Sequence, residues 1–135
     1  MSAQLTGNIT YQGWKEEETG PAGTYPRLAR ASVTNSFSGG IEAAATSCEY
    51  TLVYADEANG TFTGLELVTG TLDGRAGTFV LAERGSFTAD GAVHGHIEVV
   101  EGTGTGDLAG LRGTGSFVYR NGQTAFPYTL GFELG

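Results

Sequence analysis

The chain has 135 residues, of which 39% are hydrophobic and 16% are charged. This length suits one domain, and this composition is too apolar and too weakly charged for a disordered chain. Fifteen acidic and seven basic side chains give a net charge of −8, which has the wrong sign for binding phosphates and argues against nucleic acid as a partner. With neither a basic leader nor an apolar run of about 20 residues, the sequence predicts a cytoplasmic protein without a membrane partner.

The predicted elements are strands throughout. Eight runs of the chain carry the alternating or β-branched and aromatic pattern of strands. In chain order, these runs cover residues 4–14, 28–38, 41–55, 61–72, 76–88, 92–101, 113–120 and 126–134. Turn residues such as Asp73-Gly74, a strong hairpin signal, separate consecutive runs, and a charged segment over 15–21 is predicted to be a loop. The alanines in 41–46 would also suit a helix, but the aromatic and β-branched residues after them favour a continuous strand.

Short connections between consecutive strands predict an antiparallel meander. Its closure into a barrel would remove the exposed edges that an open sheet presents. A barrel of about eight strands has room inside for side chains or for one small ligand. The 23 glycines follow no triplet period and lie between or inside the strands, which excludes a collagen-like chain. The sequence therefore predicts an all-β fold, a closed antiparallel eight-stranded meander barrel formed by a single domain over 1–135.

A glycine-rich stretch between the sixth and seventh strands joins strand to strand and does not open a helix, so it is not a phosphate-binding loop. Four segments of the chain, this stretch included, form an ordered set of motifs. They are residues 31–39, 64–70, 77–81 and 104–113. This set resembles the allene oxide cyclase-like barrels, a superfamily that includes dirigent proteins and bacterial cyclases, and it is most similar to small bacterial members of unassigned function.

The resemblance implies a calycin-like barrel and, by analogy with allene oxide cyclase and the bacterial cyclases, an isomerase or cyclase that needs no cofactor. Such an enzyme would hold one small, mostly apolar metabolite in a folded shape, and confinement would lower the reaction barrier. Two alternatives stay open. The first is a non-enzymatic carrier or sensor that uses the same cavity, and the second is a structural oligomer whose barrel is filled by side chains.

Glu66 is the sharpest single candidate for chemistry. It lies in the middle of a predicted strand and shares its side with Phe62 and Val68, so the surrounding face is apolar. A carboxyl enclosed by apolar walls has a raised pKa and can donate a proton near neutral pH. The alternatives are a position on the barrel exterior or an ion pair with Arg84 or Arg112.

The two histidines of the chain, His94 and His96, alternate with other residues on one predicted strand and share a face with Glu98. They are candidate acid–base residues of a polar cavity lining, and the alternative is a plain solvated strand face. A metal site would have only these imidazoles together with carboxylates or water, and no structural zinc site can form around the single Cys48, interpreted as a small buried hydrophobe. The sequence therefore predicts no metal and no cofactor.

Aromatic side chains are predicted to line the ligand cavity, with polar groups that fix the ligand's orientation. The candidates for substrate binding are Trp14, Tyr50, Tyr54, Phe117 and Tyr119. Core packing is the alternative role for each of them. Other aromatic residues, such as Phe126 and Phe132, exceed what a narrow interior could hold, so a subunit contact and a homo-oligomer are also predicted.

Overall fold

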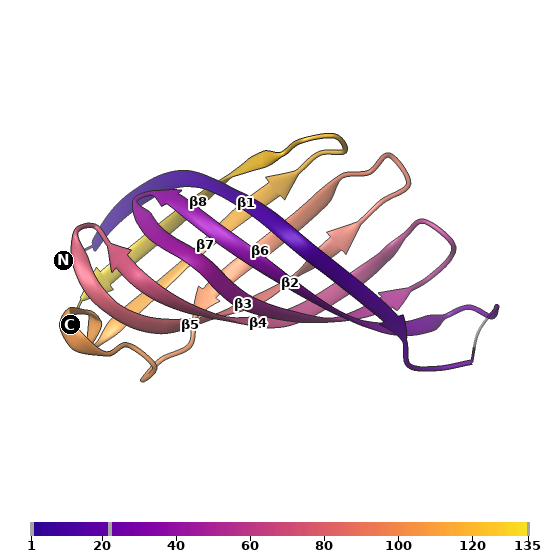
Figure 1. Ribbon diagram of the computed structural model, residues 1–135, viewed down its shortest axis with the longest axis horizontal. Helices are drawn as coiled ribbons and strands as arrows, with labels where there is room; N and C mark the ends of the chain where they lie inside the picture. Colours follow the sequence, from indigo (N-terminus) through magenta and orange to yellow (C-terminus); the bar gives the residue numbers. More distant parts are fainter. Residues whose placement is uncertain (1, 22, 135) are drawn as a thin grey trace.

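Eight strands follow one another around a closed antiparallel barrel in the computed structural model, which describes residues 2–21 and 23–134 (Figure 1). The strands are β1 (Ser2–Glu18), β2 (Arg27–Gly39), β3 (Ile41–Tyr54), β4 (Gly60–Leu72), β5 (Arg75–Phe87), β6 (Val93–Val99), β7 (Leu111–Tyr119) and β8 (Ala125–Leu134). Each strand pairs with the next one in sequence, and β8 closes the ring by pairing with β1. The predicted fold class and strand order are confirmed.

The first strand runs further than the sequence predicted. The charged segment expected to be a loop continues β1 to Glu18, and residues 15–18 pair with residues 29–32 of β2. A β-bulge between Gln12 and Lys15 makes this possible, with Gly13 at a φ of +72°. The charged side chains of residues 15–18 are exposed to solvent, so a run of charges is compatible here with a strand that extends beyond the core.

One end of the barrel is closed by the glycine-rich stretch between β6 and β7. It contains a short 3₁₀-helix, η1 (Gly106–Leu108), and inserts the fully buried side chain of Leu108 beside Gly77 of β5. The backbone of Thr105 donates to the carbonyl oxygen of Thr78 at 2.9 Å, which fixes the stretch to the barrel wall. Both chain termini lie at this closed end in Figure 1.

Several interior glycines allow aromatic rings to lie against the neighbouring strand. A Cβ atom added at Gly95 would lie 2.2 Å from Cε2 of Phe117, and one at Gly64 would lie 2.5 Å from Cδ1 of Tyr50. Such close approaches leave no room for a side chain at either glycine. Because the two rings cover the wall, they leave space near the barrel axis.

Phe126 and Phe132, predicted to form a subunit contact, instead face the interior of the barrel. Their side chains are only 8% and 7% exposed, because both alternate along β8 with outward residues. The prediction of a homo-oligomer therefore loses the residues on which it rested. Among the residues that the structure describes, there is no helix with the length and apolar character needed to cross a membrane.

Candidate functional site

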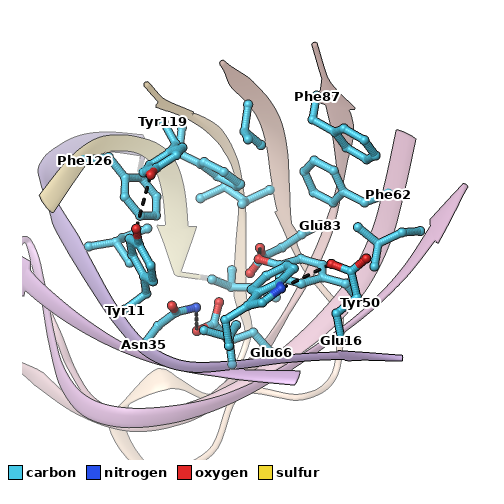
Figure 2. A pocket seen from close by; sticks show the side chains of 18 of the residues that line it. Tyr11, Glu16, Asn35, Tyr50, Phe62, Glu66, Glu83, Phe87, Tyr119 and Phe126 are labelled. Atoms are coloured by element: carbon cyan, nitrogen blue, oxygen red, sulfur yellow. Dashed lines mark hydrogen bonds between the residues drawn. The ribbon is translucent and has the colours of Figure 1, made fainter. Parts of the chain in front are cut away.

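A cavity of about 490 Å³ occupies the interior of the barrel, between the core at the closed end and the loops at the other end. All eight strands contribute to its lining, which is predominantly aromatic and aliphatic (Figure 2). Trp14 and Tyr11 line the cavity and yet are 47% and 41% exposed, so the cavity opens to solvent beside them. Its size and its apolar walls are those of a site for one small molecule.

Glu66 on β4 lies deep in this cavity and is 1% exposed. Its Oε2 atom accepts a hydrogen bond from Nδ2 of Asn35 at 2.9 Å (Figure 2). The same oxygen accepts another hydrogen bond from Oγ1 of Thr46. Two side-chain donors therefore converge on one oxygen of this carboxyl and fix its position. No ion pair to Arg84 or Arg112 forms, because Arg112 pairs with Glu101 at 3.2 Å and Arg84 lies on the outer side of β5.

A bulge in β3 places one of these donors. Ile41 and Ala43 face inward, but an extra residue near Ala45, whose φ is +56°, resets the alternation so that Thr46 also faces inward. The irregularity interrupts the pairing of β3 with both β2 and β4. Residues 41–46 therefore form a bulged strand, and the alternative that they form a helix is wrong. Bulges commonly redirect side chains at sites of function in this way.

Glu83 on β5 is the second buried carboxyl of the cavity and is 5% exposed. Oε1 of Glu83 accepts a hydrogen bond from the hydroxyl of Tyr50 at 2.8 Å. Burial raises the pKa of Glu83 well above its ordinary value, and the neighbouring Glu66 raises this pKa further, whereas the Tyr50 hydroxyl lowers it. Glu83 therefore keeps its proton to a higher pH than an exposed carboxyl does.

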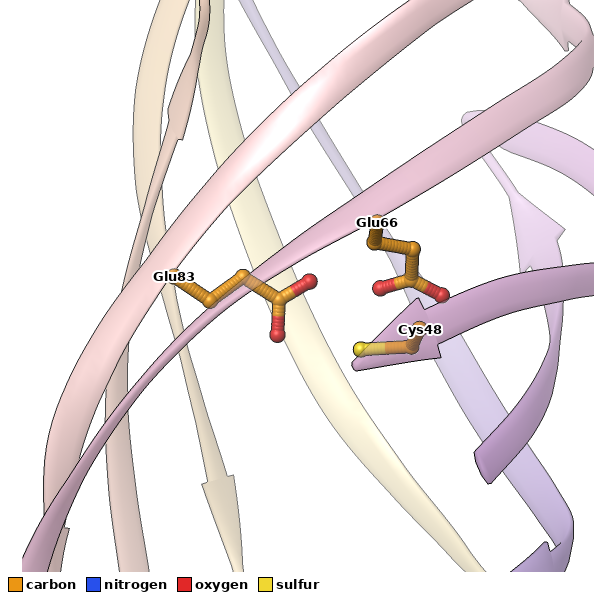
Figure 3. A group of neighbouring side chains, drawn as sticks. All are labelled: Cys48, Glu66 and Glu83. Atoms are coloured by element: carbon orange, nitrogen blue, oxygen red, sulfur yellow. The ribbon is translucent and has the colours of Figure 1, made fainter. Parts of the chain in front are cut away.

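Cys48 completes a compact group with the two carboxyls (Figure 3). The Sγ atom of Cys48 and one oxygen each of Glu66 and Glu83 lie within 4.8 Å of one another. These three atoms are close enough together to contact a single metal ion. Burial raises the pKa of the Cys48 thiol, and both carboxylates raise it further, so a metal would have to displace a tightly held proton. Cys48 is buried in the wall, as its interpretation as a small hydrophobe predicted.

The comparisons with known proteins agree with this barrel. A family model described as a protein of unknown function, DUF3224, matches residues 5–132. The chain belongs to the DUF3224 family. A crystal structure of a DUF3224 protein of unknown function from Shewanella oneidensis MR-1 is 28% identical, with a TM-score of 0.81, and the match covers 100% of this chain and 99% of that one. No match was found among curated proteins. The predicted kinship with proteins of unassigned function is therefore confirmed.

The five aromatic residues predicted from the sequence all line the cavity of this DUF3224 barrel. They are Trp14, Tyr50, Tyr54, Phe117 and Tyr119. Glu66 lies among them as predicted, at the deep end rather than on the barrel exterior. The structure thus brings six of the eight predicted site residues together, and their part in binding or catalysis stays a prediction.

His94 and His96 lie elsewhere. They occupy the outer side of β6, where they alternate with Val93 and Ile97, which line the cavity. The apolar residues of this strand take the inward positions, and strict alternation then sends both imidazoles outward. The expectation that the histidines line the cavity is wrong for this DUF3224 chain. The solvated strand face, which the sequence left open, describes them.

Three polar residues near the cavity floor were not predicted from the sequence: Glu83 and Asn35, which line the cavity, and the buried Thr46, which donates to Glu66. A signal for Glu83 was present, because it has the same parity on its strand as the apolar Phe79 and Leu81. Asn35 likewise has the same parity on β2 as the apolar Val33 and Phe37. Thr46 carried no such signal, since its inward position depends on the bulge near Ala45.

Proposed function

We propose that this DUF3224 barrel binds one small, mostly apolar molecule and isomerises or cyclises it, using confinement and proton transfer at the pair formed by Glu66 and Glu83. The observation that carries the proposal is this carboxyl pair, buried at the floor of an open cavity whose walls are predominantly aromatic and aliphatic. Two titratable groups with different surroundings are a common arrangement for acid–base catalysis.

The two carboxyls have distinct roles in the proposal. Glu83, which holds its proton to higher pH, donates that proton to a double bond or a carbonyl oxygen of the substrate. Glu66, held by Asn35 and Thr46, removes a proton from an adjacent carbon. The double bond of the substrate moves to a new position, and the product has the same atoms as the substrate. The proton then passes from Glu66 back to Glu83, which restores the starting state without a cofactor.

The aromatic wall supports confinement. Tyr50 and Phe62 pack edge to face with ring centroids 5.2 Å apart, and Phe117 packs against Phe126 with centroids 5.5 Å apart. Rings that pack against one another in this way have little freedom to move, so they define the shape of the cavity before a ligand enters. A flexible substrate held in a reactive shape loses much of its entropic barrier.

We also infer that DUF3224 is a branch of the allene oxide cyclase-like superfamily. Four sequence segments carry this inference, and the eight-stranded meander barrel is the architecture that they imply. One of these segments, 64–70, contains Glu66, and another, 104–113, closes the barrel end. The relationship favours a cyclase or isomerase over other reactions of a carboxyl pair.

The test is to incubate the protein in deuterium oxide with a collection of small unsaturated and epoxide-bearing metabolites, and to follow isomer formation by chromatography and deuterium uptake by mass spectrometry. Glu66→Gln and Glu83→Gln preserve size and should each lower turnover of a neutral metabolite by about a hundredfold or more while its binding is retained. Glu98→Gln removes an exposed carboxylate from the outer side of β6 and serves as the matched control. Binding without turnover in the wild type would instead favour a carrier or sensor.

A further inference from the structure

The charged groups that line the cavity all have one sign. They are Glu16 near the mouth and the buried pair Glu66 and Glu83, and the described lining residues include no lysine, arginine or histidine. The ion pairs found in residues 2–21 and 23–134 use other acidic side chains: Glu17, Glu18, Asp73 and Glu101. Neither carboxyl of the floor therefore has a cationic partner within the described protein.

A buried negative charge without a cation is costly, even when hydrogen bonds compensate part of the lost hydration. Asn35 and Thr46 supply two such bonds to Glu66, and Tyr50 supplies one to Glu83. Sharing one proton between the two carboxyls leaves about one negative charge at the cavity floor. A ligand with a single positive charge would neutralise this floor, whereas an anionic ligand would add a further like charge.

The path from solvent to this floor passes between aromatic rings. The outer part of the cavity is lined by Tyr11, Trp14, Phe87, Tyr119 and Phe126, and Figure 2 shows labelled rings on opposite sides of it. The faces of such rings attract cations, and the rings also provide apolar contact for hydrocarbon. The net charge of −8 also attracts cations to the protein over a longer range.

We propose that the natural ligand of this cavity is an amphiphilic organic cation, whose ammonium group lies beside Glu66 and Glu83 and whose hydrocarbon part contacts the aromatic rings. This proposal rests on the proposed function in one respect, that the cavity takes up a small molecule, and it adds the chemical class. The single ammonium charge matches the charge of the floor. The reacting double bond or carbonyl would then belong to the same amine.

Three probes with one hydrocarbon chain test the charge preference: octylamine, octanol and octanoate. Trp14 is the only tryptophan of the chain and lines the cavity, so its fluorescence reports binding, and calorimetry gives the stoichiometry. We expect one octylamine per chain, bound about tenfold or more tightly than octanol, and no binding of octanoate. Glu66→Gln should remove the preference for the amine while octanol still binds. Glu83→Gln provides a second variant if the first fails to fold, and Glu98→Gln should behave like the wild type.

Each outcome has a separate meaning. Equal binding of octanol and octylamine, or tight binding of octanoate, overturns the cation proposal and leaves a small-molecule cavity in place. Octylamine binding that persists unchanged in both glutamine variants places the amine on the acidic surface, which also overturns it. A folded protein that binds none of the three probes contradicts both this proposal and uptake of an apolar molecule by the cavity. Isomerisation of a neutral metabolite with no preference for amines would uphold the proposed function alone.

Discussion

The two ends of the barrel consist of the same strands but differ in what fills them. At the closed end, η1 packs against β5, and the side chains of Leu72, Phe79 and Leu108 are fully buried. At the open end, rings such as Trp14 stand half in solvent around a cavity of about 490 Å³. The difference indicates that one end supplies most of the packing energy, which allows the other end to keep an unfilled cavity and two costly buried carboxyls.

The largest expected contrast between the two ends is in stability. Phe79→Ala at the closed end should lower the free energy of unfolding by about 3–5 kcal/mol, because it removes a fully buried ring and leaves a void. Trp14→Ala at the open end should cost less than about 1 kcal/mol, because the ring is already half exposed. Urea denaturation measures both variants. Equal losses would show that packing energy is spread evenly along the barrel.

The next contrast concerns pH. The ordinary pKa of a glutamate such as Glu83 is 4.5. At a pH below this value, the Glu83 carboxyl holds its proton in both the folded and the unfolded chain. Above it, the unfolded chain releases the proton while the folded chain keeps it, so the free energy of unfolding falls until pH reaches the raised pKa of Glu83. Each pH unit in this interval costs about 1.4 kcal/mol. Glu83→Gln lacks this loss, so its stability relative to the wild type should increase with pH.

Urea denaturation of both proteins between about pH 4 and about pH 8 tests this expectation. The difference between the two curves isolates Glu83 from the other titrating groups of the chain. Those that lie close to it are Glu66 on the neighbouring β4 and Tyr50 and Cys48 on β3. Parallel curves for the two proteins would mean that Glu83 titrates as an ordinary carboxyl, and the assignment of Glu83 as proton donor would fail.

A smaller effect is expected for Tyr50→Phe. The hydroxyl of Tyr50 donates to Glu83 and lowers the pKa of that carboxyl. Its removal should raise the pKa of Glu83 and cost about 1 kcal/mol of stability at neutral pH. Carbon-detected NMR titration of the Glu83 carboxyl measures the shift directly. A lower pKa in the variant would contradict the assigned hydrogen bond.

The smallest effects are expected on the outer surface of β6. His94→Ala and His96→Ala should each change the free energy of unfolding by less than about 0.5 kcal/mol, because both imidazoles lie outside the cavity. Ligand binding and turnover should also be unchanged in both variants. A loss of turnover in either one would return the histidines to the list of catalytic candidates and would weaken the assignment to the carboxyl pair.

Much of the cavity could be predicted because alternation fixes the face of a strand residue once its neighbours are apolar. Glu66 and Glu83 both have the parity of buried residues, and the same rule that finds the first finds the second. The rule fails at irregular positions. Thr46 faces inward only because of the bulge near Ala45, and β1 reaches Glu18 only through the bulge at Gly13. Neither bulge has a sequence pattern that distinguishes it from an ordinary strand or turn.

The sequence by itself determined the eight strands and their antiparallel order, because alternation and turn chemistry are local properties of the chain. Closure was predicted on the separate ground that a closed sheet has no exposed edges. Tertiary structure alone decided which of the two faces of β6 points inward, how two carboxyls from neighbouring strands come to share one floor, and that the barrel keeps a cavity. The physical reason is that burial, desolvation and open volume depend on all eight strands at once. No single strand carries that information in its own pattern.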